Sequence, residues 1–282
     1  MLENLEDLPG LLQKLRGGAD AAIRAERMLR QLVQLELART FADTPRFQEP
    51  KRLLASAFKV YSQGPEDGMI AEVFRRIGAG ARRFVEFGVE SGLECNSAFL
   101  LVQGWSGAWI EGSSRHAAKA RKNFRGYPVE VVNDFVTVDN ADALIARLAG
   151  GEELDLLSID IDFNDYWVWR AITTVRPRLL AIEYNATLPP HLRKTVPYVA
   201  EGGWTGNYFG ASLGALEALG REKGYSLVGC SPSGVNAFFV RDDLVGDHFC
   251  APFTAVNHYE PPRYGLVGPS GHAPGMGPWV DV

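Results

Sequence analysis

Short apolar runs alternate with helical stretches along the middle of this 282-residue chain. Runs rich in β-branched and aromatic residues predict five strands, at 84–87, 108–111, 129–133, 154–159 and 179–184. Between the strands, apolar residues recur at helical spacing near 93–103, 115–124, 139–149 and 166–175. Alternation of this kind predicts a parallel sheet with helices on both faces. The nearly continuous apolar strands agree, because a parallel sheet is buried on both sides.

The alternation ends differently from the way it begins. After a helix near 211–223 come two strands at 225–230 and 235–240, separated only by 231–234. These strands must be antiparallel, because a parallel crossover needs a dozen or more residues. The sequence therefore predicts a Rossmann-like α/β sheet of five parallel strands closed by an antiparallel C-terminal hairpin. A plain dinucleotide-binding sheet would not end in this way.

The two ends of the chain predict extensions to this domain, which spans residues 59–250. Residues 1–58 carry leucines at helical spacing and no residue types suited to chemistry, so we expect a helical packing or dimerisation arm rather than a substrate lid. Residues 251–282 are rich in proline and glycine, which excludes a helix or an interior strand. Their aromatic residues favour an extended arm laid over the domain, and a loose tail is the alternative.

Composition narrows the classes of function. A formal net charge of −5 argues against a broad nucleic-acid surface, which needs a basic excess. The three cysteines are scattered without a CxxC pair, so we expect neither disulfides nor a thiolate zinc site. No apolar run approaches the roughly 20 residues that span a bilayer. Acidic residues stand near the N-terminus where a secretory signal would carry bases, so we expect a cytoplasmic protein without a membrane partner.

The segment from Glu86 to Gly92 closes the first predicted strand and opens a helix. Glycines at 88 and 92 let the backbone turn sharply and approach a ligand closely. The pattern E-x-G-x-x-x-G resembles the first motif of class I S-adenosylmethionine-dependent methyltransferases. The resemblance implies that Glu86 holds the methionine amino group, directly or through water. A dinucleotide site would need glycine where Glu90 stands, and a glutamate would repel a pyrophosphate.

The next two strand ends supply further candidates for binding this cofactor. Glu111 and Gly112 end the second strand about twenty residues after the glycine turn, where a carboxylate can accept both ribose hydroxyls. A solvent-exposed strand end is the alternative for Glu111. At the third strand end, the resemblance implies that Asp134 accepts from the adenine amine and that Phe135 covers the ring. An ordinary strand-to-loop turn would use the same two residues.

A second resemblance covers residues 60–240. The element 60–68, which contains Gln63 and Asp67, precedes the first strand much as a similar element does in FkbM-type methyltransferases and their relatives. The resemblance implies that this element approaches the cofactor and that a hydroxyl is O-methylated, often on a sugar or polyketide-type product. The chain departs from this family at 158–167, where the family's Lys and Glu-Gly pair are missing, so the acceptor and the base remain open.

Acidic residues gather where the fourth and fifth strands end. Ligands bind outside the carboxyl ends of the strands in an open α/β sheet. Asp160, Glu183 and Asn185 are similar in position to the Mg²⁺ ligands of metal-dependent catechol-type methyltransferases. A magnesium ion there would orient a substrate oxygen and lower its pKa. The alternative is that the acids hold backbone amides and the substrate without any metal.

Three residues are candidates for the catalytic groups. Asp162 and Asp160 follow the fourth strand, and His191 lies in the loop after the fifth strand, where acceptors bind in the resembling fold. A lone loop histidine is also common as a solvated side chain. The long connection 186–209 predicts part of the acceptor pocket, with Trp204, Tyr208 and Phe209 as its apolar wall. Core packing of these aromatic residues is the rival interpretation.

Together these features predict an S-adenosylmethionine-dependent enzyme that methylates a small-molecule hydroxyl, with Mg²⁺ as a further candidate cofactor and a homodimer formed through either arm. Two other classes stay open. One is an NAD- or nucleotide-sugar-binding oxidoreductase, although the chain lacks the second glycine of that fingerprint and a Tyr-x-x-x-Lys pair. The other is a non-catalytic scaffold subunit that keeps the methyltransferase fold.

Overall fold

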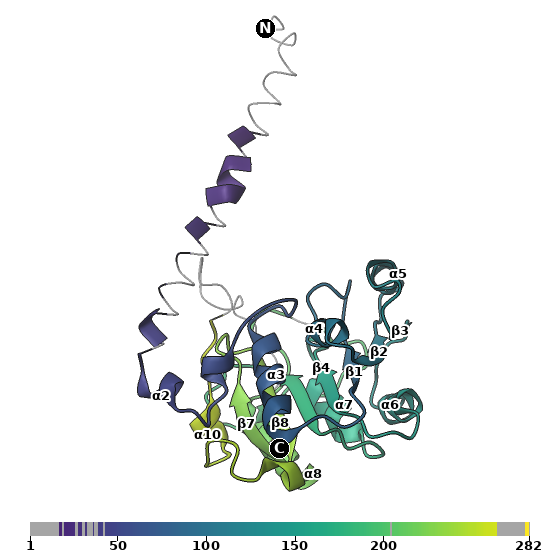
Figure 1. Cartoon of the computed structure of the whole chain (residues 1–282). Helices are drawn as coiled ribbons and strands as arrows, with labels where there is room; N and C mark the ends of the chain where they lie inside the picture. The colour runs from purple at the N-terminus through teal and green to yellow at the C-terminus, as the bar shows by residue number, and fades with distance from the viewer. Residues whose placement is uncertain are drawn as a thin grey trace, which may run out of the picture.

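A seven-stranded sheet with the order β3-β2-β1-β4-β5-β8-β7 forms the centre of the molecule (Figure 1). The computed structural model describes residues 43–203, 205–263 and 280–281, and scattered residues between 17 and 41. The strands are β1 (Arg83–Phe87), β2 (Ser106–Ile110), β3 (Val129–Val132), β4 (Leu156–Ile159), β5 (Leu179–Glu183), β7 (Tyr225–Cys230) and β8 (Asn236–Arg241). The first five are parallel, and β8 runs antiparallel between β5 and β7. The predicted Rossmann-like fold is therefore confirmed.

Helices cover both faces of this sheet. They are α3 (Glu66–Ile77), α4 (Ala98–Val102), α5 (Ser114–Asn123), α6 (Ala141–Ala149), α7 (Asp165–Ala171) and α8 (Leu213–Lys223). Successive side chains of a strand point to opposite faces, so Val85 joins the core under α6, α7 and α8, while Phe84 joins the core under α3, α4 and α5. Strand β4 is buried along its whole length, as expected for the middle of a parallel sheet.

Short elements complete the fold. They are α2 (Pro45–Gln48), the 3₁₀ helix η1 (Leu54–Ser56), α9 (Asp242–Val245), α10 (Ala255–His258), and the strands β6 (Lys194–Thr195) and β9 (Val280–Asp281), which pair antiparallel. The prediction of no helix within 251–282 was wrong at α10, where the Thr254 hydroxyl caps the turn by accepting from the Asn257 amide. Residues 264–279, including Tyr264 and Trp279, lie outside the described residues.

The beginning and the end of the described chain pack against each other beside β7. Arg46 donates hydrogen bonds to the Glu260 carboxylate at 2.8 Å and to the carbonyl oxygens of Asn257 and Tyr259. Arg263 donates to the second oxygen of Glu260 at 2.9 Å, and its guanidinium lies 4.6 Å from the ring centroid of Phe41. We call these four residues, Phe41, Arg46, Glu260 and Arg263, the terminal clamp. It holds α2 close to α10 (Figure 1).

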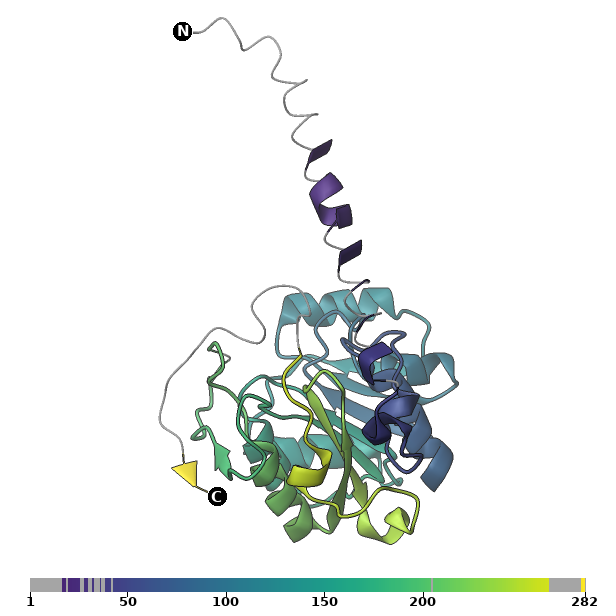
Figure 2. The same ribbon diagram turned by 90° about the vertical axis from the view of Figure 1, so that its left-hand side faces the viewer.

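The predicted N-terminal helical extension is described only in part. The described residues from 17 to 41 are helical, and Ile23, Met28, Leu29 and Leu32 are exposed apolar side chains among them. Figure 2 shows this part projecting away from the sheet. Among the described residues, no helix combines the length and apolar character needed to cross a bilayer. The dimerisation arm stays a prediction.

Candidate functional site

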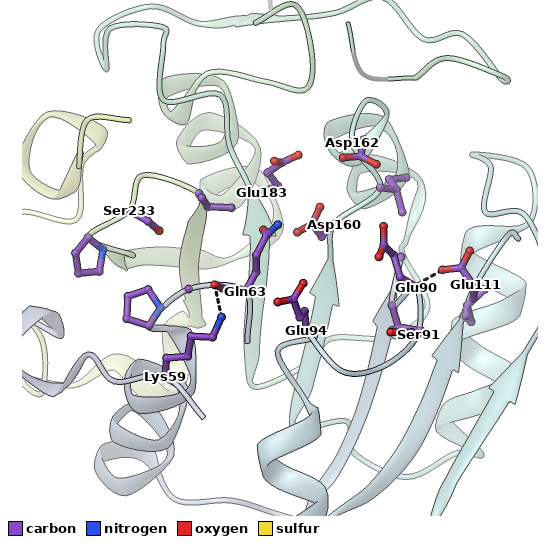
Figure 3. Close-up of a pocket in the computed structure, with 18 of the residues that line it drawn as sticks. Lys59, Gln63, Glu90, Ser91, Glu94, Glu111, Asp160, Asp162, Glu183 and Ser233 are labelled. Carbon is purple, nitrogen blue, oxygen red and sulfur yellow. Dashed lines mark hydrogen bonds between the residues drawn. The ribbon is translucent and has the colours of Figure 1, made fainter. Parts of the chain in front are cut away.

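A pocket of about 1640 Å³ opens at the carboxyl ends of the parallel strands (Figure 3). Open α/β sheets bind ligands at this edge. The volume exceeds the roughly 300–1,000 Å³ of a typical small-molecule pocket. The pocket therefore has room for two molecules side by side, as a cofactor and an acceptor would require.

The glycine turn after β1 forms part of the pocket wall at Gly88. This glycine has a φ of 77°, and a Cβ atom built on it would lie 1.7 Å from the carbonyl oxygen of Asp160. Any other residue would clash with the backbone of the β4 end, so the close approach requires glycine. Gly92 also has a positive φ, but it packs against the ring of Trp109 behind the pocket. The structure thus places Gly88 at the site and Gly92 in support of the loop.

Glu111 ties the loops after β1 and β2 together at one end of the pocket. One carboxylate oxygen accepts from the Glu90 amide at 2.7 Å (Figure 3). The other accepts from the Ser113 amide, also at 2.7 Å. Each oxygen retains a further lone pair for a ligand hydroxyl. Gly112, Asp134 and Phe135 line the same end of the pocket, and the Phe135 ring is 54% exposed. The structure therefore brings the predicted ribose and adenine residues together.

Glu86 differs from its predicted role, because it does not line the pocket. Its carboxylate is 3% exposed and accepts from the backbone amides of Asn96 and Ser97 at 2.7 and 2.9 Å, and from the Ser97 hydroxyl. Burial raises the pKa of Glu86, and these hydrogen bonds oppose that rise. The side chain therefore organises the start of α4, which follows the glycine turn.

The element before α3 reaches the pocket through Gln63 and not through Asp67. Asp67 is 1% exposed, and one of its carboxylate oxygens accepts from the amides of residues 60, 61 and 62 at 2.6–2.9 Å. The Ser62 hydroxyl donates to its other oxygen at 2.8 Å. Gln63 and Lys59 line the pocket, and the Lys59 ammonium donates to the Gln63 carbonyl at 2.9 Å (Figure 3). Asp67 thus shapes the turn that carries both residues.

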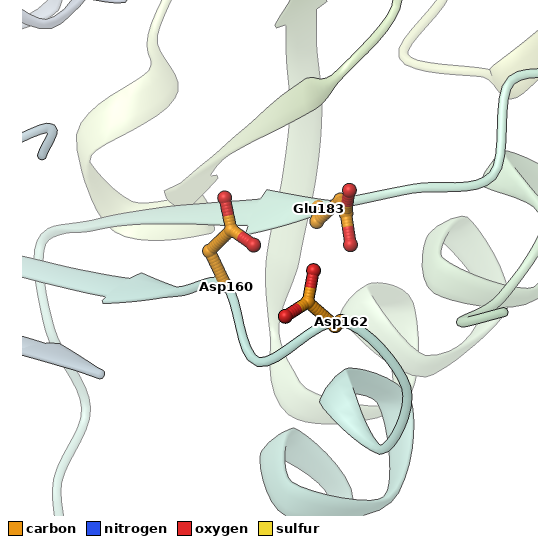
Figure 4. Close-up of side chains that lie close together, drawn as sticks. All are labelled: Asp160, Asp162 and Glu183. Carbon is orange, nitrogen blue, oxygen red and sulfur yellow. The ribbon is translucent and has the colours of Figure 1, made fainter. Parts of the chain in front are cut away.

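Three carboxylates converge at the middle of the pocket (Figure 4). Asp160 and Asp162 follow β4, Glu183 ends β5, and one oxygen from each lies within 4.8 Å of the others. We call these residues the acid trio. Burial and the neighbouring acids raise the pKa values of Asp160 and Glu183 well above their ordinary values. A divalent cation, for which carboxylate oxygens are suitable ligands, would relieve this repulsion.

Asn185, a predicted metal ligand, does not belong to this group, and that prediction was wrong. It is completely buried, and its amide nitrogen donates to the carbonyls of Asn207 and Phe209 at 2.9 and 3.0 Å. Its amide oxygen accepts from the backbone and hydroxyl of Thr187. Strand β5 ends at Glu183, so the alternation that would place Asn185 beside it no longer applies. Asp162 occupies the third position instead.

His191 and the aromatic residues of the 186–209 connection also lie elsewhere. His191 is exposed on the turn before β6 and does not line the pocket. Tyr208 and Phe209 pack with Phe163 and Val196 in a small core of their own. The rival interpretation, core packing, is therefore correct for these two residues. Trp204 lies outside the described residues, and Gly202 is the part of this connection that lines the pocket.

The opposite wall of the pocket was not predicted from the sequence. It comes from the N-terminal segment, the β7–β8 turn and Arg263, and includes Phe41, Phe47, Ala57, Pro232, Ser233 and Val235. The Phe41 and Phe47 rings stack with centroids 5.1 Å apart. Phe41, Phe47 and Ala57 therefore place part of the N-terminal segment against the site, as the lid alternative had allowed. The break in helical spacing at Thr44-Pro45 was the one available signal.

Glu66 is a further buried acid, next to Pro65, which lines the pocket. It is 1% exposed, and within the described residues neither carboxylate oxygen makes a hydrogen bond of normal geometry. Burial raises its pKa above the ordinary value of 4.5, and the nearby polar groups of Ser231 and Asn236 oppose that rise. A carboxyl group in this position favours its neutral form.

Replacing Glu66 with glutamine is expected to reduce the loss of stability that the protein suffers as pH rises. A carboxyl whose pKa is raised by folding contributes stability fully below its unfolded pKa of 4.5, and this contribution disappears as pH rises through the folded pKa. Each pH unit between these two values costs the wild type up to about 1.4 kcal/mol. Urea unfolding between pH 5 and 8 should show that the free energy of unfolding of the Glu66→Gln variant rises relative to that of the wild type as pH increases. The exposed Glu222→Gln variant is the control, and its free energy of unfolding should change with pH in parallel with the wild type. The same parallel behaviour in Glu66→Gln would contradict the prediction.

Comparison with known proteins gave matches only among solved structures, since no family model and no curated protein matches the sequence. One similar structure is the magnesium protoporphyrin IX methyltransferase ChlM of Synechocystis with bound SAM, at 12% identity and a TM-score of 0.42, covering 77% of this chain and 96% of that one. Another is the N-terminal domain of EvdMO1 with SAH bound, at 15% identity and 0.41, covering 64% and 80%. A TehB-like SAM-dependent methyltransferase from Corynebacterium glutamicum matches at 13% and 0.36, covering 61% and 86%.

Proposed function

We propose that this chain is an S-adenosylmethionine-dependent methyltransferase that O-methylates a hydroxyl group of a small molecule. The proposal rests mainly on one observation. A single pocket contains both the predicted cofactor-binding residues Gly88 and Glu111 and, beside them, the acid trio. A pocket of about 1640 Å³ has room for both reactants. Positioning an acceptor oxygen in line with the methyl group supplies much of the rate of such a transfer.

The cofactor end fits the chemistry of S-adenosylmethionine residue by residue. Glu111 has free lone pairs for the two ribose hydroxyls, and Asp134 and Phe135 offer an acceptor and an apolar cover for adenine. Gly88 lines this end of the pocket, and its lack of a Cβ atom lets the turn after β1 lie against the backbone of Asp160. When bound, the cofactor supplies an activated methyl group on a sulfonium. Glu90 argues against a pyrophosphate at this position, because two negative groups would repel each other.

The acid trio is assigned to the acceptor hydroxyl. Asp160, Asp162 and Glu183 would hold Mg²⁺, which lowers the pKa of a bound hydroxyl. Asp162, Asp160 and His191 were the predicted catalytic candidates. Asp162 and Asp160 remain candidates to receive the hydroxyl proton, since both line the pocket and His191 does not. The aromatic wall at Phe41 and Phe47 suits an acceptor of the sugar or secondary-metabolite type with an apolar part.

Thermal unfolding in the presence of candidate ligands tests this proposal. S-adenosylhomocysteine at about a hundred times its dissociation constant should stabilise the protein by roughly 2.7 kcal/mol, which raises Tm by several degrees. NAD should give no shift, and Mg²⁺ should add a further shift through the acid trio. A shift with NAD alone would identify an oxidoreductase instead. No shift with either ligand would favour a non-catalytic scaffold.

A further inference from the structure

Lys59 stands out because it offers positive charge to a strongly acidic pocket. The acidic residues that line the pocket are Glu90, Glu94, Glu111, Asp134, Asp160, Asp162 and Glu183. The basic residues that line it are Lys59, His116 and Arg263. The cofactor carries two cationic groups, the sulfonium and the amine, and one anionic group, the methionine carboxylate. The two cations suit the acids, whereas the carboxylate needs a cation of its own.

Two of the three basic residues are poorly placed for this task. Arg263 already pairs with Glu260, donates to the Pro232 carbonyl at 2.6 Å and stacks on Phe41. His116 lies on α5 one turn after Ser113, at the pocket end where Glu111 is assigned to the ribose. Lys59 makes one hydrogen bond, to the Gln63 carbonyl, and among the described residues no carboxylate lies within ion-pair distance of it.

From these placements we propose that Lys59 binds the carboxylate of the cofactor's methionine group, an inference that rests on the proposed function. Figure 3 shows Lys59 and Gln63 on the side of the pocket opposite Glu111, with Glu94 and Asp160 between them. The ribose and the methionine carboxylate stand at the two ends of the cofactor molecule. Two of the three ammonium donors of Lys59 remain for a ligand after the bond to Gln63.

Asp67 gives the turn that carries Lys59 its rigidity. Its carboxylate holds three consecutive backbone amides, from residue 60 to residue 62, directly after Lys59. The bond from Lys59 to the carbonyl of Gln63 closes the turn from the other side. The ammonium is therefore positioned before the ligand arrives, which reduces the entropy lost on binding. This gives the buried Asp67 a positioning role without contact to the cofactor.

Three ligands that differ in one group each provide the test. S-adenosylhomocysteine has the amine and the carboxylate, its decarboxylated analogue keeps only the amine, and 5′-methylthioadenosine has neither. Calorimetry should show that Lys59→Met weakens S-adenosylhomocysteine binding about tenfold, as expected for loss of one charge-assisted hydrogen-bonded pair. The affinities of the other two ligands should change less than twofold. Lys59→Arg should retain most of the affinity for S-adenosylhomocysteine.

The matched control is Lys119→Met, an exposed lysine of α5 that does not line the pocket, which should leave all three affinities unchanged. An equal loss for all three ligands in Lys59→Met would overturn the inference, because the lysine would then act on the pocket as a whole. Unchanged binding of S-adenosylhomocysteine would overturn it as well. If the wild type binds none of the ligands, the proposed function itself fails.

Discussion

Replacing Glu111 with alanine is expected to weaken S-adenosylhomocysteine binding about a hundredfold. Without the carboxylate, the ligand would lose two hydrogen bonds from its ribose hydroxyls, each worth roughly 1.5–3 kcal/mol for a charged acceptor. Part of that energy is recovered from water, and part of the loss comes from the loops, since Glu111 also holds the amides of Glu90 and Ser113. Isothermal titration calorimetry measures the effect, with exposed Glu222→Ala as the control that should bind normally.

The role of Glu111 as the ribose acceptor can be separated from its role in the loops by varying the ligand. The wild type should bind 5′-methylthioadenosine much more tightly than its 2′,3′-dideoxy counterpart. The Glu111→Ala variant should bind the two with nearly equal affinity, because the group that distinguishes them is gone. If the variant keeps the full preference for the hydroxylated ligand, another residue reads the ribose.

Neutralising any one member of the acid trio is expected to weaken divalent-cation binding at least a hundredfold. With S-adenosylhomocysteine present, Mn²⁺ titrations followed by electron paramagnetic resonance should show one site in the wild type. The variants Asp160→Asn, Asp162→Asn and Glu183→Gln should each lose it, because a neutral amide is a far weaker ligand than a carboxylate.

The same three variants should behave in the opposite way without metal. Burial and mutual repulsion raise the pKa values of Asp160 and Glu183, so removing one charge should raise the metal-free Tm at pH 8. Asp139→Asn, which changes an exposed acid that does not line the pocket, is the control for both measurements. A wild type that binds no Mn²⁺ at millimolar concentration would leave the trio to act by proton transfer alone.

Local patterns in the sequence were sufficient to predict the sheet. Apolar runs such as 84–87 and 154–159 became β1 and β4, and the short turn at 231–234 required the antiparallel pair that β7 and β8 form. Part of the site could be predicted for the same reason, because Gly88, Glu111 and Asp160 each directly follow a strand that the sequence predicts. What the sequence predicted well is therefore what a strand and its next few residues determine.

The misses concern where side chains point and which distant segments meet. Glu86 and Asp67 stand in the expected motifs, yet both turn inward to backbone amides, a choice that spacing does not reveal. The prediction that Asn185 is a metal ligand failed because it assumed that the strand alternation continues to residue 185, whereas β5 ends at Glu183. The wall that includes Phe41 and Ala57 depends on contacts with residues more than 200 positions away. The break at Thr44-Pro45 signals the end of a helix, but a single sequence does not show which distant residues the segment contacts.

The terminal clamp has a consequence for the order in which this protein matures during synthesis. All seven strands of the main sheet are present in the chain once residue 241 has been made. Glu260 and Arg263, which bind Arg46 and pack on the pocket residue Phe41, follow later. A nascent chain can thus complete its sheet before the terminal clamp forms and positions Phe41 at the pocket. Full competence to bind should therefore appear only after Arg263 has been synthesised, and proteolytic cleavage just before Glu260 should remove it while leaving the sheet folded.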